Sequence, residues 1–228
     1  GWIFLNSVAK YQIPTINNLA ANPDVSALLP DFSPVPSQEV NQNQKENSQY
    51  THLVWRHDVN ADNFFQLAGF LRNSYANFTT DPLNALAYTP DATAPFSAAN
   101  QQRKAYSLGT RLDYTWIPNK QHLVKSGVQF QYTNAQNTAQ FFVFARDPVT
   151  GLPVGPVLSQ TGSNTNVQVR EEFWVQDQWS PSDSLTFNLG LRGDAIQSFY
   201  NEGQVSPRIG ITYKLNRSNV FHAYYGRL

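Results

Sequence analysis

Residues 173–194 read FWVQDQWSPSDSLTFNLGLRGD, and this stretch predicts a β-hairpin with one apolar face and one polar face. Phe173, Val175 and Trp179 alternate with Trp174 and two glutamines before a Pro-Ser-Asp turn. After the turn, apolar residues again occupy every second position: Leu185, Phe187, Leu189 and Leu191. Such alternation is typical of strands whose faces meet different surroundings. In a soluble sandwich the apolar face is the core, whereas in a membrane barrel it meets lipid and the polar face lines a wet lumen.

The composition of the chain excludes several classes of structure and partner. Only 14% of the 228 residues are charged and the net charge is zero, which argues against a nucleic-acid partner. The chain has no cysteine, so disulfides and thiolate metal sites are excluded. No stretch approaches the roughly 18–20 apolar residues of a spanning helix, but barrel strands are only half apolar. The chain starts GWIF and has no methionine, so we expect a processed protein or a piece of a longer one.

Period-two alternation recurs along the chain and predicts eight strands, or nine if residues 2–9 form one. The others are expected at 50–59, 63–73, 105–117, 122–132, in the hairpin 167–195, at 205–215 and at 220–226. The alternation does not decide which side chains of residues 50–73 lie on the apolar face of the sheet and which on the polar face.

The expected connections alternate in length. Tight turns are predicted at 60–62, 118–121, 181–183 and 216–219. Longer segments are predicted at 10–49, 74–103, 133–166 and 196–204. A membrane barrel has short periplasmic turns and long extracellular loops, and the pattern favours that architecture.

Aromatic residues support the same interpretation. Trp116, Trp179 and Tyr213 each lie on the apolar face close to a tight turn, as in an aromatic girdle at a membrane interface. The alternative is three ordinary core aromatics. Asp177 falls on the apolar face by strict alternation. It lies near the short-turn end, where a carboxylate costs only about 0–1 kcal/mol, or a bulge turns it inward.

The polar faces predict a lumen wall. The residues expected to line it are Arg111, Asp113, Lys125, Gln129, Gln176, Arg192 and Arg208. These side chains would suit the wet outside of a sandwich equally well. Large apolar residues that continue to the ends of strands of roughly ten residues favour the barrel.

Several of these segments resemble the barrel domain of TonB-dependent outer-membrane receptors. They are FWVQDQWSPSDSLTFNLGLRGD, EGQVSPRIGITYKL, NVFHAYYGRL and, less closely, SLGTRLDYTWIPNKQHLVKSGVQFQY, which together extend from Ser107 to Leu228. The resemblance implies an all-β, antiparallel transmembrane barrel in the bacterial outer membrane. Family barrels have 22 strands and an N-terminal plug, but nothing in this chain resembles the plug or its coupling box. An open sheet edge is not viable in lipid. We therefore expect residues 1–228 to be part of one barrel domain, a segment of about 8–10 strands of a larger barrel.

The resemblance also implies a function, the uptake of a scarce solute such as a siderophore, cobalamin, a glycan or a peptide. The implied partners are outer-membrane lipid, a plug domain, an energy-coupling protein and the solute itself. Long outer loops are where such folds place recognition. The loop residues expected to contact a ligand are Tyr88, Phe96, Gln140, Phe141, Phe142 and Phe144.

Catalytic and metal sites are not predicted. His52, His57, His122 and His222 have no metal-ligand spacing with acidic residues, and we expect no cofactor, metal or enzymatic activity. Two other functions stay open. One is a passive porin-like or adhesin-like barrel, and the other is a soluble antiparallel β-binding domain.

Overall fold

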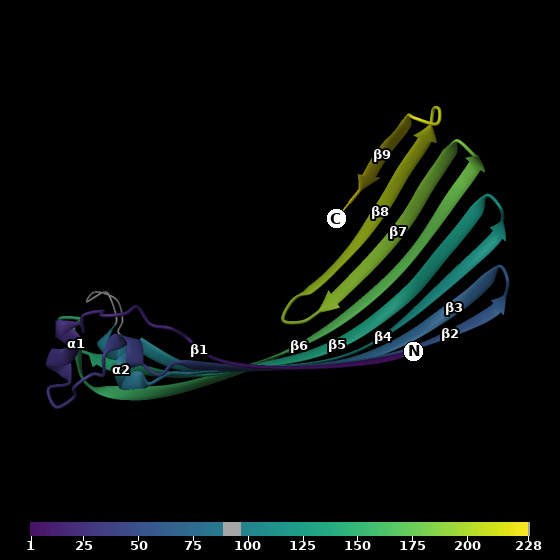
Figure 1. The fold of residues 1–228 in the computed structure, drawn as a ribbon. Helices are drawn as coiled ribbons and strands as arrows, with labels where there is room; N and C mark the ends of the chain where they lie inside the picture. Colours follow the sequence, from purple (N-terminus) through teal and green to yellow (C-terminus); the bar gives the residue numbers. More distant parts are fainter. Residues whose placement is uncertain (89–96, 228) are drawn as a thin grey trace.

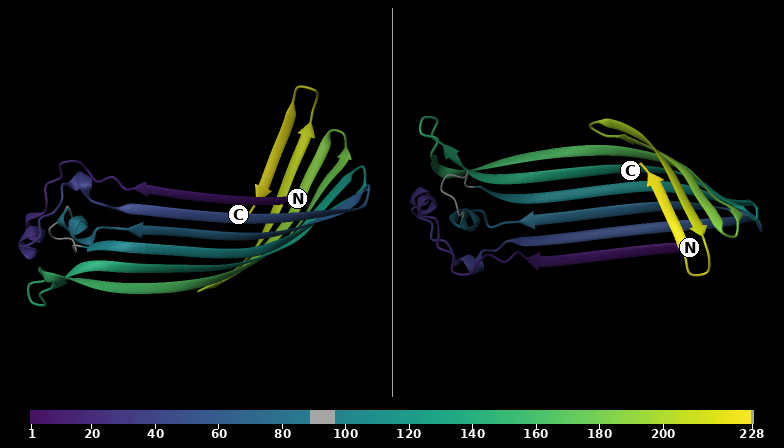
Figure 2. Two further views of the ribbon diagram at one scale, coloured as in Figure 1. Left: turned by 60° about the horizontal axis from the view of Figure 1, so that its bottom comes forward. Right: turned by 90° about the horizontal axis from the view of Figure 1, so that it is seen from above.

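A computed structural model describes residues 1–88 and 97–227, which form one antiparallel sheet of nine strands (Figures 1 and 2). The order of the strands across the sheet is their order along the chain. They are β1 (Trp2–Gln12), β2 (Asn43–Asn60), β3 (Asn63–Thr79), β4 (Ser97–Asn119), β5 (His122–Arg146), β6 (Pro153–Ser182), β7 (Leu185–Gln197), β8 (Asn201–Lys214) and β9 (Val220–Gly226). The predicted all-β antiparallel fold is confirmed, and residues 2–9 do belong to a ninth strand.

The sheet curves like a segment of a cylinder wall, and β1 and β9 form its two edges within the described residues (Figure 1). At one end the strands are joined by residues 61–62, 120–121, 183–184 and 215–219, and we call this the short-turn end. The opposite end, which we call the long-loop end, carries the connections 13–42, 80–96, 147–152 and 198–200.

Strands extend into all four segments that were predicted as long connections, which corrects the sequence-based boundaries. Residues 133–146 continue β5 and residues 153–166 belong to β6, so the expected loop at 133–166 shrinks to 147–152. The expected loops at 74–103 and 196–204 likewise shrink to 80–96 and 198–200, and β1 and β2 shorten the segment 10–49. The sequence 133–140, TNAQNTAQ, is polar or small on both faces, so it shows no period-two contrast although its hydrogen-bond ladder continues.

Asparagine side chains build the tight turns. Asn60 accepts hydrogen bonds from the backbone N–H groups of Asp62 and Asn63, at 2.9 and 3.0 Å. Asn216 does the same for Ser218 and Asn219, at 3.0 and 2.9 Å. These are Asx turns, in which a short side chain replaces a backbone acceptor and fixes the reversal.

The β5–β6 connection is a tight, hydrogen-bonded loop. The Asp147 carboxylate accepts from the backbone N–H groups of Thr150 and Val149, at 2.7 and 2.9 Å, and from the Thr150 hydroxyl. These bonds, first of all that from the Thr150 backbone, lower the pKa of Asp147. Gly151 adopts a φ of 69°, which favours glycine.

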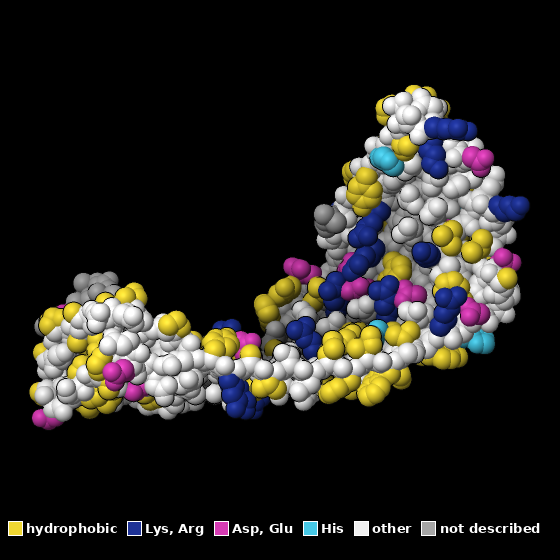
Figure 3. Space-filling view, in the orientation of Figure 1, with side chains coloured by type: hydrophobic (Ala, Val, Ile, Leu, Met, Phe, Trp, Pro, Cys, Tyr) yellow, Lys and Arg dark blue, Asp and Glu magenta, His cyan; other side chains and the backbone are white. Residues whose placement is uncertain are grey.

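The two faces of the sheet differ in chemistry. Directly opposed residues of antiparallel strands share a face. One register row passes through Trp55, Leu67, Leu112, Val128 and Phe173 and defines the outer face. The adjacent row passes through Val54, Ala68, Arg111, Gln129 and Glu172 and defines the inner face. The register therefore settles the facing of residues 50–73. In Figure 3, Lys and Arg side chains gather in the hollow of the curved sheet.

An apolar band runs across the outer face. On β4 it extends from Trp116 to Tyr106, about 34 Å along the strand at ~3.4 Å per residue. A strand tilted by ~45° spans about 25 Å in that length, which matches the lipid-facing band of a membrane barrel. Leu112, Val128 and Phe173 stay 40%, 53% and 49% exposed, so no second layer of the described chain covers the band as a sandwich would require.

Asp177 stays on the outer face and has a partner there. Its carboxylate lies 2.8 Å from Nδ1 of His122, its neighbour across β5 and β6. The His122 ring stacks on Trp179 with 6.0 Å between centroids, and Trp179 stacks on Phe187 at 5.2 Å. The Asp177 carboxylate on the apolar face is therefore paired with His122, beside an aromatic cluster near the short-turn end.

A small core lies at the long-loop end. The helices α1 (Pro23–Leu28) and α2 (Pro82–Ala87) place Val25 and Leu86 against Ala98 of β4 and Phe144 of β5. A 3₁₀ helix, η1 (Ser37–Glu39), lies in the same connection as α1. In the described part of the chain, no helix has the length and hydropathy needed to cross a membrane.

Aromatic rings cover glycines of neighbouring strands. A Cβ atom added to Gly127 would lie 2.2 Å from the Trp174 ring and 2.6 Å from the backbone oxygen of Leu112. The Phe70 ring covers Gly109 in the same way, at 2.2 Å. A ring over a glycine shields exposed backbone and fixes the register of the pair.

We predict that Gly127→Ala lowers the free energy of unfolding by about 1–3 kcal/mol, because the new methyl group meets fixed backbone as well as a ring. Urea unfolding of the full-length protein in detergent micelles measures this change. Gly69→Ala is the matched control, since nothing lies within 4 Å of its added Cβ. Equal losses at both positions would contradict the packing argument.

Candidate functional site

The arginines of the strands sort by face. Cross-strand register and alternation place those of β2–β4 and β6–β8 on the inner face: Arg56, Arg72, Arg103, Arg111, Arg170, Arg192 and Arg208. Acidic residues share this face with them, and a cluster forms where β6, β7 and β8 run side by side.

Glu172 is the centre of this cluster. One carboxylate oxygen lies 2.5 Å from Nε of Arg170 and the other lies 2.9 Å from Nη2 of Arg192. The Glu172 side chain is only 7% exposed, whereas the two arginines are 40% and 30% exposed. Removal of a carboxylate from water is costly unless it is paired, and here two guanidinium groups compensate one charge.

Asp194 extends the cluster onto β7. It accepts three hydrogen bonds from Arg192, at 2.8 to 3.1 Å, and lies 3.5 Å from Nη2 of Arg170. The four side chains Arg170, Glu172, Arg192 and Asp194 therefore form one network, which we call the arginine–carboxylate cluster. A bidentate arginine has a fixed orientation, so the cluster is a rigid part of the wall.

A second ion pair adjoins the cluster on β4. Arg111 donates two hydrogen bonds to Asp113, both 2.7 Å long. The Arg111 guanidinium also lies 4.4 Å from the centroid of the Trp174 ring, a cation–π contact between strands β4 and β6. Trp174 thus covers Gly127 with its ring while it supports a cation.

A cavity of about 810 Å³ lies beside the cluster on the inner face. Its lining combines cluster residues with β8: Arg170, Arg192, Asp194, Ile196, Glu202, Gln204, Ser206 and Arg208. Gln204 donates to the hydroxyl of Ser206 at 2.8 Å, which fixes part of the wall. Within the described residues, Arg208 has no ion pair, so its guanidinium remains available in the cavity.

The structure places every residue predicted for the lumen on the inner face. Arg111, Asp113, Arg192 and Arg208 lie in or beside the cluster. Lys125 and Gln176 are direct cross-strand partners, and Gln129 lies between Arg111 and Glu172 in the register. Their contact with a plug or a solute stays a prediction.

Sequence analysis missed the residues that join the cluster together. Arg170, Glu172 and Asp194 have no motif of their own, and only their alternation with Glu171, Phe173 and Gly193 signals an inner position. Asp194 comes close to Arg170 and Glu172 only because β6 pairs with β7, and no local sequence pattern indicates that pairing.

The residues expected to bind ligand in loops have other positions. Gln140, Phe141, Phe142 and Phe144 all lie in β5, not in a loop. Phe144 is buried in the small core and Phe142 packs against it, while Gln140 accepts a hydrogen bond from Asn100 at 3.2 Å.

Tyr88 is the only one of these residues that the structure places in a connection. It ends α2, and its hydroxyl donates to the carbonyl oxygen of Val35. Phe96 lies outside the described residues. Ligand contact by any residue of this set stays a prediction.

The described residues contain no group of three or more His, Asp or Glu side chains arranged to hold a metal ion. The chemistry that the inner face offers is instead charge recognition by arginine and carboxylate groups.

We predict that Glu172→Gln destabilises the barrel by roughly 1–3 kcal/mol, because Arg170 and Arg192 lose their shared counter-charge. Urea unfolding of the full-length protein in micelles gives the value. The neighbouring Glu171→Gln removes the same charge from the outer face, where no arginine loses a partner within the described residues, so we expect no destabilisation. Equal effects of the two substitutions would refute a structural role of the cluster.

Comparison with solved structures identifies the fold. The ferric citrate transporter FecA in its unliganded form aligns with 99% of this chain at a TM-score of 0.59 and 14% identity. The ferric-catecholate import receptor Fiu from E. coli K12 aligns with 94% at a TM-score of 0.54 and 10% identity. The chain covers 33% of FecA and 38% of Fiu, so it spans only about a third of the length of each. The comparison with curated proteins gave no match.

A family model gives the assignment. The model described as "TonB dependent receptor-like, beta-barrel" matches residues 5–227, nearly the whole chain. The match includes strands β1–β3, for which sequence analysis quoted no family motif. The chain therefore belongs to the family of TonB-dependent receptor-like β-barrels.

Proposed function

We propose that this chain forms part of the wall of an outer-membrane barrel that takes up a scarce solute. The observation that carries the proposal is the division of the sheet into two surfaces. The outer face bears an exposed apolar band about 25 Å tall, and the inner face bears the arginine–carboxylate cluster beside an 810 Å³ cavity. Family membership supports the same role.

The proposal also assigns each end of the strands to one side of the membrane. In this proposal the short-turn end faces the periplasm and the long-loop end faces the outside, as in bacterial barrels. Trp116, Trp179 and Tyr213 form the periplasmic girdle. Residues 1–228 belong to one barrel domain, and the edges at β1 and β9 pair with further strands, since open edges are not viable in lipid.

The partners follow from the family. A plug domain contacts the inner face, and an energy-coupling protein drives its movement. The arginine–carboxylate cluster is the strongest charged feature on that face and serves as the wall against which the plug and the solute move. The role is transport, and no catalytic step is proposed.

An arginine without an ion pair in the cavity supports an anionic solute. Arg208 lines the cavity and has no ion pair within the described residues, whereas Arg170 and Arg192 are paired with Glu172 and Asp194, and Glu202 also lines the cavity. Arginine binds carboxylate and phenolate oxygens through directed hydrogen bonds. FecA is described as a ferric citrate transporter and Fiu as a ferric-catecholate import receptor. We therefore favour a ferric siderophore complex over cobalamin, a glycan or a peptide.

The orientation of the sheet in lipid is directly testable. Spin labels placed singly at residues 185–191 of the full-length protein in lipid should show oxygen accessibility that peaks at Leu185, Phe187, Leu189 and Leu191. A water-soluble paramagnetic relaxation agent should be more accessible at the intervening positions than at these four. Exclusion of both reagents from the leucine positions would mean that protein covers the band, and the transport proposal would fail.

The solute class is tested at Arg208. Arg208→Gln should raise the half-saturation concentration for uptake of ⁵⁵Fe-labelled ferric citrate by about tenfold, because one charge-assisted hydrogen bond is lost. Uptake of a neutral ferric hydroxamate should not change. Arg217→Gln, in the exposed β8–β9 turn, is the matched control. An unchanged affinity for ferric citrate, or an equal change for both complexes, would refute the anionic class.

A further inference from the structure

The first half of β6 has a ladder partner on one side only. The pairing of β6 with β7 ends at Val169 and Gln197, whereas its pairing with β5 continues to Pro153. Figure 1 shows β6 continuing toward α1 past the turn that joins β7 and β8. Within the described residues, no strand pairs with the other side of residues 153–168. This edge arises where β7 turns back, and not at either end of the chain.

The unpaired side of β6 presents main-chain donors and acceptors. The backbone N–H of Ser180 donates to the carbonyl oxygen of Gln121 across β5, at 2.7 Å. Even-numbered residues of β6 therefore direct their main chain toward β5, and odd-numbered residues direct theirs to the other side. Those on the unpaired side are Ser159, Thr161, Ser163, Thr165 and Val167.

This edge lacks the devices that usually keep sheet edges apart. Natural edge strands are protected by charged side chains, proline or bulges. Residues 157–168 of β6 contain no charged residue and no proline, and their pairing with β5 is regular. The paired segment of β5, residues 133–144, is uncharged as well. A regular, uncharged edge favours pairing with another uncharged strand.

Two contacts limit the length of the available edge. At the upper end α1 lies against β6, since a Cβ atom added to Gly155 would lie 3.1 Å from the carbonyl oxygen of Leu28. At the lower end the Ser198 hydroxyl, in the β7–β8 turn, donates to Oδ1 of Asn166 at 3.1 Å. Residues 159–168, which we call the open edge, extend over about 34 Å at ~3.4 Å per residue.

An exposed aromatic pair lies at the lower end of the open edge. Phe199 and Tyr200 of the β7–β8 turn pack edge to face, with 4.5 Å between ring centroids. The Phe199 residue is 81% exposed. Aromatic residues are enriched at protein interfaces. The pair therefore offers an apolar contact at the point where an added strand would begin.

The position of the open edge limits which partner can reach it. The register row of Tyr106 passes through Asn134 and Val167, so the open edge starts where the apolar band ends. In the proposed orientation it lies outside the cell. A second barrel in the same membrane does not fit, because its strands would continue into the band, where β7 already occupies the place beside β6. A segment that approaches from outside does fit.

We propose that the open edge binds an extended, uncharged segment of a protein outside the cell, which adds one strand to the sheet. The added strand runs antiparallel to β6 and starts with an aromatic residue beside Phe199. Its main chain pairs with the odd-numbered residues of the open edge, as in other complexes formed by strand addition. The inference depends on the proposed orientation of the barrel but not on the solute.

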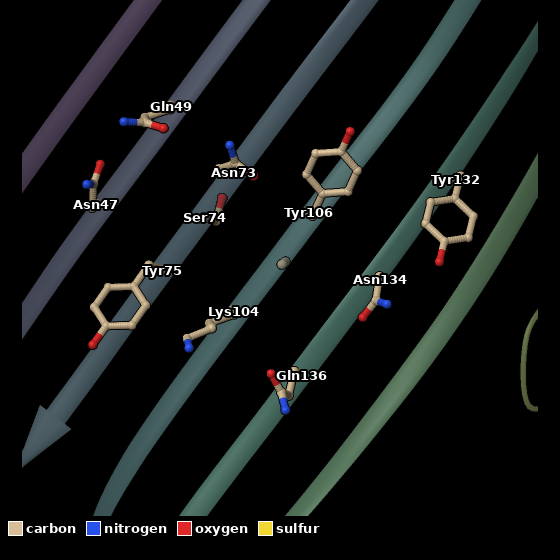
Figure 4. Close-up of a pocket in the computed structure, with 11 residues that line it drawn as sticks. Asn47, Gln49, Asn73, Ser74, Tyr75, Lys104, Tyr106, Tyr132, Asn134 and Gln136 are labelled. Atoms are coloured by element: carbon tan, nitrogen blue, oxygen red, sulfur yellow. The ribbon is translucent and has the colours of Figure 1, made fainter.

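The neighbouring strand β5 supplies a model of the partner. Its residues 132–140, YTNAQNTAQ, already pair with residues 161–169 on the other side of β6. Figure 4 shows Tyr132, Asn134 and Gln136 of this segment beside a hollow of about 630 Å³. A synthetic peptide of this sequence, acetylated and amidated at its ends, is uncharged and begins with an aromatic residue.

The test measures binding of this peptide, labelled with a fluorophore, to the full-length protein in detergent micelles by fluorescence anisotropy. Ser163→Pro should weaken binding about tenfold, because proline removes an N–H group from the middle of the open edge. Proline is tolerated at an edge position whose N–H faces solvent. Ser163→Ala is the matched control and should bind normally. Equal affinities of these two variants, or no saturable binding by the native protein, would overturn the proposal.

The aromatic contact is tested at Phe199. Phe199→Ala should weaken binding of the peptide about fivefold, because one ring of the aromatic contact is lost. An unchanged affinity would overturn the antiparallel placement that the proposal requires.

Modified peptides test the same pairing without a change in the protein. N-methylation of every second residue removes the N–H groups from one edge of the peptide only. One of the two alternating sets should abolish binding, and the other should leave it intact. Equal effects of the two sets would contradict strand addition.

A large carrier distinguishes docking outside the cell from passage through the lumen. The biotinylated peptide bound to streptavidin should bind as well as the free peptide, and saturating ferric citrate should displace neither. Loss of binding on the carrier, or displacement by ferric citrate, would assign the peptide to the solute path and overturn the proposal. Oxygen accessibility at Leu189 reports separately whether the band lies in lipid, so failure of the barrel proposal is distinguishable.

Discussion

A single layer of β-sheet has no interior, and this constraint governs the whole structure. Each strand must suit one medium on its outer face and another on its inner face, because no second layer of the described chain covers either. The ladder of backbone hydrogen bonds satisfies the main chain of the strands between the edges β1 and β9. Side chains then have only two directions available, and the alternation of Leu112 with Arg111 and Asp113 on β4 is the simplest expression of that choice.

The inner face pairs its charges both along strands and across them. Glu172 is almost fully removed from solvent, yet Arg170 and Arg192 reach both of its oxygens. At the short-turn end, Nδ1 of His122 lies 2.8 Å from Asp177, a carboxylate on the outer face. In both places the carboxylate has a partner on an adjacent strand. Register across strands and the two-residue spacing along a strand, as in Arg170–Glu172 and Arg192–Asp194, therefore both determine the electrostatics of this protein.

Sequence reasoning succeeded where the two media differ most. The hairpin of β6 and β7, the tight asparagine turns and the inner position of Arg111 were all predictable, since period-two contrast is strong there. Sequence analysis failed to predict the strand where polar or small side chains occupy both faces. Residues 133–140 carry small and polar side chains on both faces, so β5 was expected to end about fourteen residues before Arg146. Phe144 was misplaced for the same reason, and the cluster around Glu172 depends on pairing that no local pattern encodes.

The length of β5 and β6 changes how the mouth of the barrel behaves. The paired strands continue well beyond the apolar band, to the Phe142–Ser159 pair and the six-residue turn closed by Asp147. A rim made of hydrogen-bonded sheet has already lost most of its backbone freedom, so little further entropy is lost when a solute meets it. In the proposed transporter, selection at the rim would then depend on the fixed shape of these paired strands. Related barrels with equally long strands would differ in selectivity through segments outside the sheet, such as 13–42, while the rim keeps a constant shape.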